Sequence, residues 1–259
     1  MMKLLCIPLV FCVSSVFSQD LSMFEKREFT SADGHKLLYR ILFPQQYDRT
    51  KKYPLVLFLH GAGERGNDNE KQLVHGSKQF LSAEVREKFP AIVVFPQCPE
   101  DDFWSSVKFD RNAAPFRFDF DYTRRPAPVA LLQSIDLVKD LIAHESVDTQ
   151  RVYITGLSMG GMGTFEAVYR YPDLFAAALP ICGGGDTLHY QRVQTPFWIF
   201  QGGADQVVNP KYSRAMVHKL KELKVKVKYT EYPGVNHNSW DNAFAERNYL
   251  RWMFGKRRR

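Results

Sequence analysis

The sequence is poor in cysteine and lacks the P-loop of many nucleotide-binding proteins and the common patterns of metalloenzymes. Only four of its 259 residues are cysteines. The P-loop pattern GxxxxGK[ST] does not occur, and neither does a zinc-protease pattern or a cluster of Cys and His at metal-ligand spacing. We therefore expect no metal and no cofactor. Internal repeats and an interdomain linker are also absent, so we expect a single domain.

The composition is that of one globular domain. Hydrophobic residues make up 45% of the chain, charged residues 24% and aromatic residues 14%, which suits an α/β protein with a sizeable core and excludes a disordered or fibrous chain. The net charge is +7, part of it in the terminal residues GKRRR. A basic tail can bind nucleic acid or acidic surfaces. Because the other basic residues are interspersed with acidic ones, we expect a solvated tail and no nucleic-acid partner.

The N-terminus has the pattern of a secretory signal peptide. Lys3 supplies a positive charge, an apolar run follows, and small residues precede Gln19. The apolar run is short for a bilayer span, and a buried first strand or helix is the alternative interpretation. We predict a signal peptide at residues 1–18, a domain at residues 19–259, a secreted or periplasmic location, and no stable membrane insertion of the mature chain.

Cleavage of this signal peptide would leave two cysteines, Cys98 and Cys182. The two could pair in an oxidising compartment. Each ends a predicted strand, and the two strands are not expected to be neighbours. Buried free thiols are therefore the favoured interpretation.

Strand and helix patterns alternate along the chain. The stretch 26–44 predicts two antiparallel strands joined at Asp33-Gly34. Apolar residues recur at helical spacing from Leu131 to Ile142 and from Tyr212 to Leu223. Short runs that are apolar on both faces, typical of strands buried in a parallel sheet, occur at 53–61, 91–97, 151–156, 176–184, 196–203 and 226–233. The predicted fold class is α/β, with a mostly parallel central sheet flanked by helices.

Residues 98–128 interrupt this alternation. The segment is long for a simple connection and rich in aromatic residues, Arg and Asp. Its stretch FRFDFDY alternates like a short strand, which could form an edge hairpin over the core. Ligands bind to such sheets at the carboxyl ends of the strands, and this segment follows a strand. We therefore expect it to form a wall of the ligand site.

The stretch YITGLSMGGMGTF, residues 153–165, places a serine between glycines at a predicted strand-to-helix turn. Gly156-Leu-Ser158-Met-Gly160 matches the nucleophile-elbow pattern G-x-S-x-G in the context that this pattern requires. A serine at the apex of so sharp a turn has an unfavourable backbone conformation, so its neighbours must be small. A tight turn without chemistry is the alternative interpretation.

A nucleophilic serine needs a base and an acid, and the sequence provides both at later strand ends. Asp205 and His237 each lie in a glycine-containing loop directly after a predicted strand, which brings them to the edge of the sheet where Ser158 is expected. The order Ser, Asp, His is that of the α/β-hydrolases. We predict these three residues as a catalytic triad. Asp186 and His189 fit less well, because they follow an earlier strand.

Attack on a carbonyl also requires hydrogen-bond donors for the oxyanion that develops. The backbone N–H of Met159, directly after the serine, is one predicted donor. The other is expected from the glycine-containing turn in LHGAGERGND, where Ala62 is the favoured residue. His60 is interpreted as a residue that orients this turn.

The predicted mature chain resembles a single-domain α/β-hydrolase over almost its whole length. It is most similar to secreted esterases related to carbohydrate esterase family 1, to polyhydroxybutyrate depolymerase-like enzymes and to a group labelled predicted peptidases. The stretches LHGAGERGND, PQCPEDDFW, GLSMGG, GGADQVV and NHNSW carry this resemblance. The resemblance implies ester hydrolysis through an acyl-enzyme, often on acylated plant polysaccharides. The absence of a long apolar lid argues against long-chain lipid substrates.

The resulting hypothesis is a serine carboxylesterase that acts on a small-molecule or polysaccharide acyl ester, of the feruloyl or acetyl type. Trp104 and Trp240 are predicted to bind the substrate, and Phe116, Phe118 and Tyr122 could stack on a sugar or a phenolic acyl group. Core packing is the alternative for each of these aromatic residues.

Two other functions stay open. The same triad could hydrolyse peptides, although the propeller domain of many related peptidases is not found in the sequence. The fold could also serve as a non-catalytic carbohydrate-binding module, but such a module has no need of an intact triad.

Overall fold

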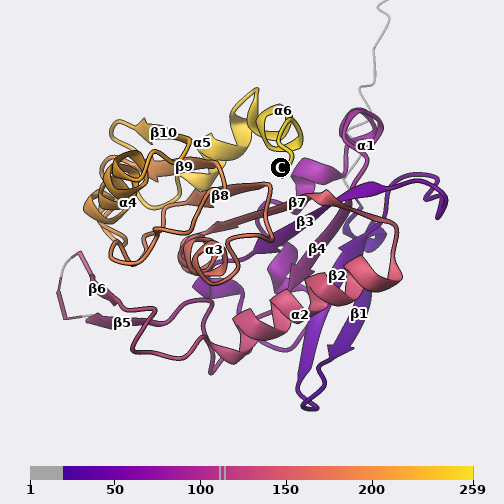
Figure 1. Cartoon of the computed structure of the whole chain (residues 1–259), viewed down its shortest axis with the longest axis horizontal. Coiled ribbons are helices and arrows are strands. Elements are labelled where there is room, and N and C mark those ends of the chain that lie inside the picture. The colour runs from indigo at the N-terminus through magenta and orange to yellow at the C-terminus, as the bar shows by residue number, and fades with distance from the viewer. Residues whose placement is uncertain (1–19, 111, 114, 259) are drawn as a thin grey trace, which may run out of the picture.

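The predicted strands form one eight-stranded sheet in the computed structural model, which describes residues 20–110, 112–113 and 115–258 (Figure 1). The predicted signal peptide lies outside the described residues. From β4 to β10 across the sheet, neighbouring strands are parallel, whereas β1 and β2 are antiparallel additions at one edge. In order across the sheet, the strands are β1 (Glu25–Thr30), β2 (Lys36–Leu42), β4 (Ile92–Pro96), β3 (Tyr53–Leu59), β7 (Val147–Leu157), β8 (Ala177–Ile181), β9 (Phe197–Gly202) and β10 (Val227–Tyr232).

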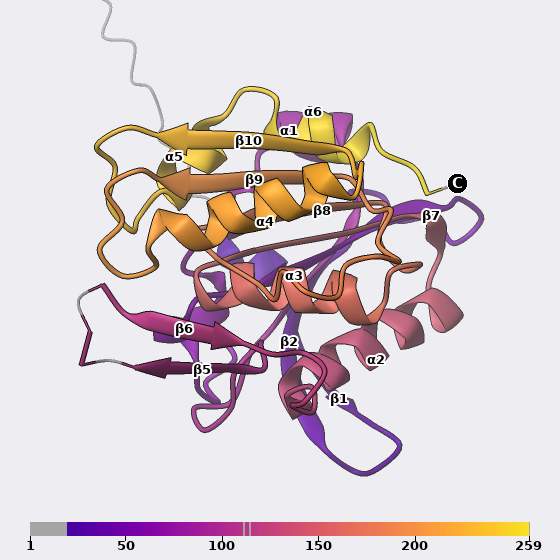
Figure 2. The ribbon, with the colours of Figure 1, turned by 60° about the vertical axis from the view of Figure 1, so that its left-hand side comes forward.

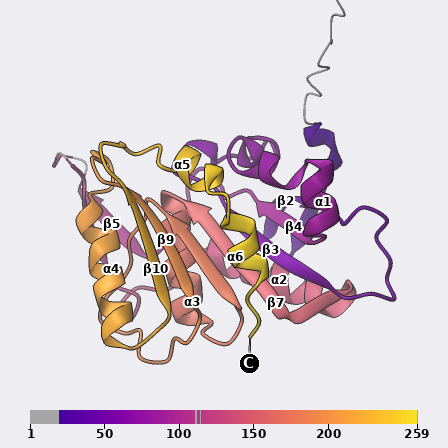
Figure 3. The same ribbon diagram turned by 90° about the horizontal axis from the view of Figure 1, so that it is seen from above.

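Helices cover both faces of this sheet, which confirms the predicted fold class. One face carries α2 (Val129–His144), α3 (Met159–Arg170) and α4 (Pro210–Glu222), and the other carries α1 (Ala83–Lys88), α5 (Trp240–Ala245) and α6 (Tyr249–Phe254). Figure 3 shows α6 in front of the central strands. Helices α2 and α4 were predicted from their periodicity. Helices α1, α5 and α6 were not predicted, because each has only six residues, too few for a periodic pattern.

Two hydrophobic cores explain why the strand sequences are apolar on both faces. Successive side chains of a strand point to opposite faces of the sheet. In β3, Leu55 and Leu57 pack into the core beneath α2, α3 and α4, whereas Val56 and Phe58 pack into the core beneath α5 and α6. A one-sided sheet would have shown polar residues at every second position.

The hairpin predicted at Asp33-Gly34 joins β1 to β2, and Gly34 has a φ of +84°, which suits glycine in a tight turn. Cys98 follows β4 and Cys182 follows β8; both are buried free thiols, as predicted. Strands β3 and β7 separate these two positions in the sheet. None of the helices in the described part of the chain is long and apolar enough to cross a membrane.

The segment 98–128 contains a second, two-stranded sheet. Strands β5 (Val107–Asp110) and β6 (Arg117–Phe120) pair with each other and not with the main sheet, so this hairpin is not the sheet edge that its sequence suggested. It lies beside α3 and α4 (Figure 2). The backbone N–H of Phe118 donates to the hydroxyl of Tyr212 on α4 at 2.8 Å, which attaches β6 to that helix.

Candidate active site

Ser158 occupies the sharp turn between β7 and α3. Its φ of 53° and ψ of −114° place a non-glycine residue in an unfavourable backbone region. The Ser158 N–H donates to the carbonyl of Ile181 at 2.9 Å, and the Ser158 carbonyl accepts from the N–H of Met162 at 3.0 Å. These two bonds hold the turn, so that the side chain stands at the carboxyl end of β7 and at the positive end of the α3 dipole.

The glycines on either side of Ser158 are required because backbones approach one another closely here. A Cβ atom on Gly156 would lie 2.5 Å from the carbonyl oxygen of Gly160. A Cβ atom on Gly160 would lie 1.9 Å from the carbonyl oxygen of Leu59 in β3. Any side chain at either position would push α3 away from the sheet. The glycines therefore fix the position of the serine, as the elbow pattern requires.

Three side chains form a continuous hydrogen-bonded chain at this edge of the sheet. Ser158 follows β7, Asp205 follows β9 and His237 follows β10, and the parallel strands bring all three together. The Oγ of Ser158 lies 2.9 Å from Nε2 of His237. The Nδ1 of His237 lies 2.8 Å from Oδ2 of Asp205. The predicted residues thus have the geometry of a nucleophile, a base and an orienting acid.

The Asp205 carboxylate is buried and accepts hydrogen bonds at both oxygens. Its Oδ1 accepts from the backbone N–H groups of Val207 at 2.8 Å and Val208 at 2.9 Å. Its Oδ2 accepts from Nε2 of Gln201 at 2.9 Å as well as from His237. A carboxylate can only accept, so the proton of the neutral imidazole lies on Nδ1, and Nε2 is free to accept from Ser158.

The imidazole of His237 packs edge-on against Trp240. The ring centroids are 5.4 Å apart and the ring planes are at 87°. Trp240 is half-buried at the start of α5, and its ring also lies 5.2 Å from the ring of His75. Trp240 therefore borders the catalytic histidine candidate, as its proximity in the sequence suggested.

Both predicted oxyanion donors line the same cavity as Ser158. Met159 begins α3, and N–H groups in the first turn of a helix have no acceptor within that helix. Ala62 begins a short 3₁₀ turn, Ala62–Glu64, after β3. The run Gly61 to Gly66 also has the spacing GxGxxG, but a dinucleotide-binding loop requires a full helix directly after the strand, and only this short turn follows.

His60 is buried behind the Ala62 turn. Its Nδ1 lies 2.6 Å from the Gly61 carbonyl, and its Nε2 accepts from the N–H of Cys98 at 3.0 Å. Burial lowers the pKa of His60 to about 4, so the ring is neutral at pH 7. These contacts fit a residue that orients the turn.

A cavity of about 290 Å³ lies against Ser158. Its walls are apolar, and four phenylalanines from the segment 98–128 form one side of it. The lining residues are Ala62, Phe103, Phe109, Phe116, Phe118, Ser158, Met159, Met162, Val207 and Val208. The segment therefore contributes a wall beside the serine, as expected from its position after β4.

The prediction that Trp104 lines this wall is wrong. Its side chain is fully buried, and its indole N–H donates to the carbonyl of His60 at 3.1 Å. Tyr122 is buried too, whereas Phe116 and Phe118 do line the cavity. Phe103, directly before Trp104, was missed. No local pattern in the sequence distinguishes Phe103 from Trp104.

The rival residues Asp186 and His189 have structural contacts. Asp186 is buried and accepts from the backbone N–H groups of Tyr122 at 3.0 Å and Leu188 at 2.8 Å. Its Oδ2 lies 3.6 Å from Nδ1 of His189. Within the described residues, no group of three or more His, Cys, Asp or Glu side chains could hold a metal ion.

The sheet order, the serine turn and the loops that follow β9 and β10 are those of the α/β-hydrolases. The sequence profile of the family described as "Putative esterase" matches residues 30–198. This match covers more than half of the chain, so the protein belongs to this esterase family and is a carboxylic ester hydrolase.

Individual relatives agree with this assignment. Carboxylesterase SOBER1 of Arabidopsis thaliana is 26% identical over 200 residues, which are 71% of this chain and 82% of the relative. The crystal structure of a thermostable esterase aligns with a TM-score of 0.82 and 37% identity over 92% of this chain, which spans 64% of that longer chain. A CE1 ferulic acid esterase from Anaeromyces mucronatus shares the fold, with a TM-score of 0.65, 18% identity and 90% of each chain aligned.

Proposed function

We propose that the protein is a serine carboxylesterase in which Ser158 is the nucleophile, His237 the general base and Asp205 the residue that orients the base. The hydrogen-bonded chain from Ser158 Oγ to the buried Asp205 carboxylate carries this proposal. Serine is a weak nucleophile by itself, and this chain supplies the base that activates it. The protein is further proposed to be secreted or periplasmic, on the basis of its N-terminal pattern.

The geometry supports a two-step reaction. Nε2 of His237 takes the proton of Ser158 as Oγ attacks the ester carbonyl carbon, and the N–H groups of Met159 and Ala62 receive the oxyanion. The same proton then passes to the alcohol as its bond to the acyl carbon breaks. His237 then deprotonates a water that attacks the acyl carbon, and the imidazolium returns this proton to Ser158 Oγ as the acyl–oxygen bond breaks and the acid leaves. The Asp205 carboxylate stabilises the imidazolium in both steps.

The apolar cavity supports an aromatic acyl group. An acetyl group would leave most of the phenylalanine-lined volume unfilled, whereas a feruloyl-type ring can pack against Phe103, Phe109, Phe116 and Phe118. Trp240 packs against the histidine and is half-buried, and an aromatic ring there can stack on a sugar alcohol. The proposed substrate is therefore an aryl-acyl ester of a carbohydrate, preferred over an acetyl ester.

A fluorophosphonate probe tests the nucleophile directly. Wild-type protein and the control Ser22→Ala, which removes an exposed serine, should be labelled, whereas Ser158→Ala should not. Turnover of methyl ferulate, p-nitrophenyl acetate and acetylated xylan then tests the substrate class. Labelling of Ser158→Ala at the wild-type rate would exclude the proposed nucleophile, and a preference for acetylated xylan over methyl ferulate would exclude the aryl-acyl assignment.

A further inference from the structure

A buried carboxylate lies at the base of the β5–β6 hairpin and takes no part in the proposed reaction. Glu166 belongs to α3, the helix that begins directly after Ser158, and its side chain has no exposed surface. A buried carboxylate is costly unless it is paired and hydrogen-bonded, so its partners define what it does.

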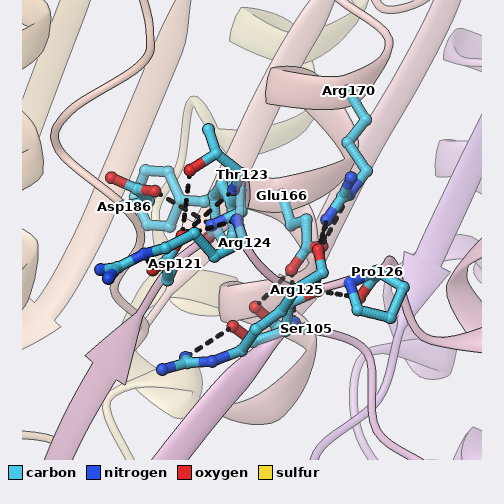
Figure 4. A network of polar contacts seen from close by, with 12 residues as sticks. Ser105, Asp121, Thr123, Arg124, Arg125, Pro126, Glu166, Arg170 and Asp186 are labelled. Atoms are coloured by element: carbon cyan, nitrogen blue, oxygen red, sulfur yellow. Dashed lines mark hydrogen bonds and ion pairs between the residues drawn. The ribbon is translucent and has the colours of Figure 1, made fainter.

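Three of these partners come from the residues directly before β5. Oε2 of Glu166 accepts from the Oγ of Ser105 at 2.9 Å and from the backbone N–H of Ser106 at 2.5 Å. Its Oε1 lies 2.6 Å from the Oγ of Ser106 and accepts from Nε of Arg170 at 2.7 Å. Figure 4 shows Ser105 and Arg170 beside this carboxylate.

The residues directly after β6 are held by the same group. Nη2 of Arg170 donates to the carbonyl of Arg125 at 3.1 Å. The Oγ of Ser106 lies 2.7 Å from the carbonyl of Pro126. One ion pair on α3 therefore holds both ends of the hairpin together and attaches them to the helix that carries the nucleophile (Figure 4).

This attachment matters because the hairpin has no other strand to hold it. It is not hydrogen-bonded to the main sheet, yet it provides Phe109, Phe116 and Phe118 to the cavity beside Ser158. The position of that wall relative to the serine therefore depends on the Glu166–Arg170 pair, on the contact with Tyr212, and on Asp186, which accepts from the N–H of Tyr122 after β6.

We propose that Glu166 is a positioning residue that determines acyl specificity, because it fixes the aromatic wall at the distance from Ser158 that an aryl-acyl group requires. The inference rests on the proposed esterase function. An aryl-acyl ester depends on the wall, whereas an acetyl ester depends only on the triad and the oxyanion donors.

Glu166→Gln tests this role with little change in volume. Whichever way its amide is turned, its NH₂ group faces donors, either at Ser105 and the Ser106 N–H or at Arg170. We expect kcat/KM for methyl ferulate to fall by about 10-fold or more, and kcat/KM for p-nitrophenyl acetate by no more than about 2-fold. Trypsin should also cut the hairpin at Lys108 or Arg117 several times faster than in the wild type, because a loosened hairpin opens locally more often.

Val168→Ala is the matched control. Val168 is fully buried on the same helix and packs into the core beneath α2, α3 and α4, and its apolar side chain can make no hydrogen bond to the hairpin network. It should lower the melting temperature but leave the ratio of the two esterase activities and the hairpin cleavage unchanged. A Glu166→Gln protein that behaves like this control would overturn the inference.

Two further results separate the possible failures. If wild-type protein hydrolyses neither ester, the proposed function fails, and unchanged trypsin cleavage of Glu166→Gln would then refute the positioning role independently. If Glu166→Gln does not fold, Arg170→Gln provides the test, because it removes the contacts of Arg170 with the Arg125 carbonyl and the Ser106 Oγ and leaves the bonds from Ser105 and Ser106 to Glu166 in place. An unchanged activity ratio in that variant would refute the inference.

Discussion

Asp205→Asn should inactivate the enzyme by reversing the tautomer of His237. The amide oxygen of the new side chain must stay at the Oδ1 position, because the N–H groups of Val207 and Val208 donate there at 2.8 and 2.9 Å. Its NH₂ group then takes the place of Oδ2 and donates to Nδ1 of His237. The imidazole proton must move to Nε2, which can no longer accept the proton of Ser158.

The hydrogen-bond partners of Asp205 cannot rearrange to satisfy the new amide. The NH₂ group would also face Nε2 of Gln201, which lies 2.9 Å from Oδ2 in the wild type. Turning the Gln201 amide would place its oxygen against the Val208 carbonyl, 3.2 Å from the present Nε2 position. One buried donor or acceptor is left unpaired in either case, at a cost of about 1–3 kcal/mol in unfolding free energy.

The expected loss of activity is about 10⁴-fold in kcat, the size found for this substitution in serine protease triads, or about 5.4 kcal/mol in activation free energy. Turnover of a p-nitrophenyl ester measures it, with Ser158→Ala as the background. Asp186→Asn is the control, since it alters another buried aspartate and should keep activity within about 10-fold of the wild type. Asp205→Asn activity above about one tenth of the wild-type value would refute the tautomer argument.

Three further outcomes are expected. Ser158→Ala and His237→Ala should each abolish most turnover, and the double variant should be no worse than either, since the residues act as a unit; additive losses in kcat would contradict this. Phe118→Ala should reduce kcat/KM for methyl ferulate by about 10-fold and barely affect p-nitrophenyl acetate; equal losses would place Phe118 outside the acyl site. The pKa of His60 is about 4 in the folded protein, below its ordinary value of 6.5. Because the unfolded chain binds the proton first, the stabilisation from a neutral His60 is complete above pH 6.5 and is lost as the pH falls towards 4. The loss in unfolding free energy is up to about 3 kcal/mol. Urea unfolding at pH 7.5 and 4.5 should therefore show a smaller loss for His60→Gln than for the wild type, and parallel losses would show that His60 titrates normally.

The sequence identified the serine turn and the order of the three site residues because the forces behind those patterns act over short distances. A Cβ atom on Gly160 would collide with the backbone of Leu59, so this position must be glycine. The serine turn can therefore be recognised from the five residues of the G-x-S-x-G pattern. Apolar runs indicated parallel strands, and parallel strands place Asp205 and His237 at one edge of the sheet whatever the rest of the chain does.

Contacts between distant segments decided which aromatic residues face the cavity. Trp104 and Phe103 are adjacent and chemically alike, but the His60 carbonyl, 44 residues away in the sequence, accepts the indole N–H and draws Trp104 into the core. A position for Phe103 in the cavity wall follows from this packing and from no local pattern.

The sequence by itself thus determined the fold class, the serine turn and the residues that meet at its edge of the sheet, since periodicity and backbone sterics are local. Only the tertiary structure decided the shape of the cavity beside Ser158. Glu166 has no pattern in the helix that distinguishes it from a solvated glutamate, and it is buried because Ser106 arrives from 60 residues earlier in the chain. Glu166 can hold the hairpin only because the packing of the hairpin against α3 brings the donors of Ser105 and Ser106 to its carboxylate.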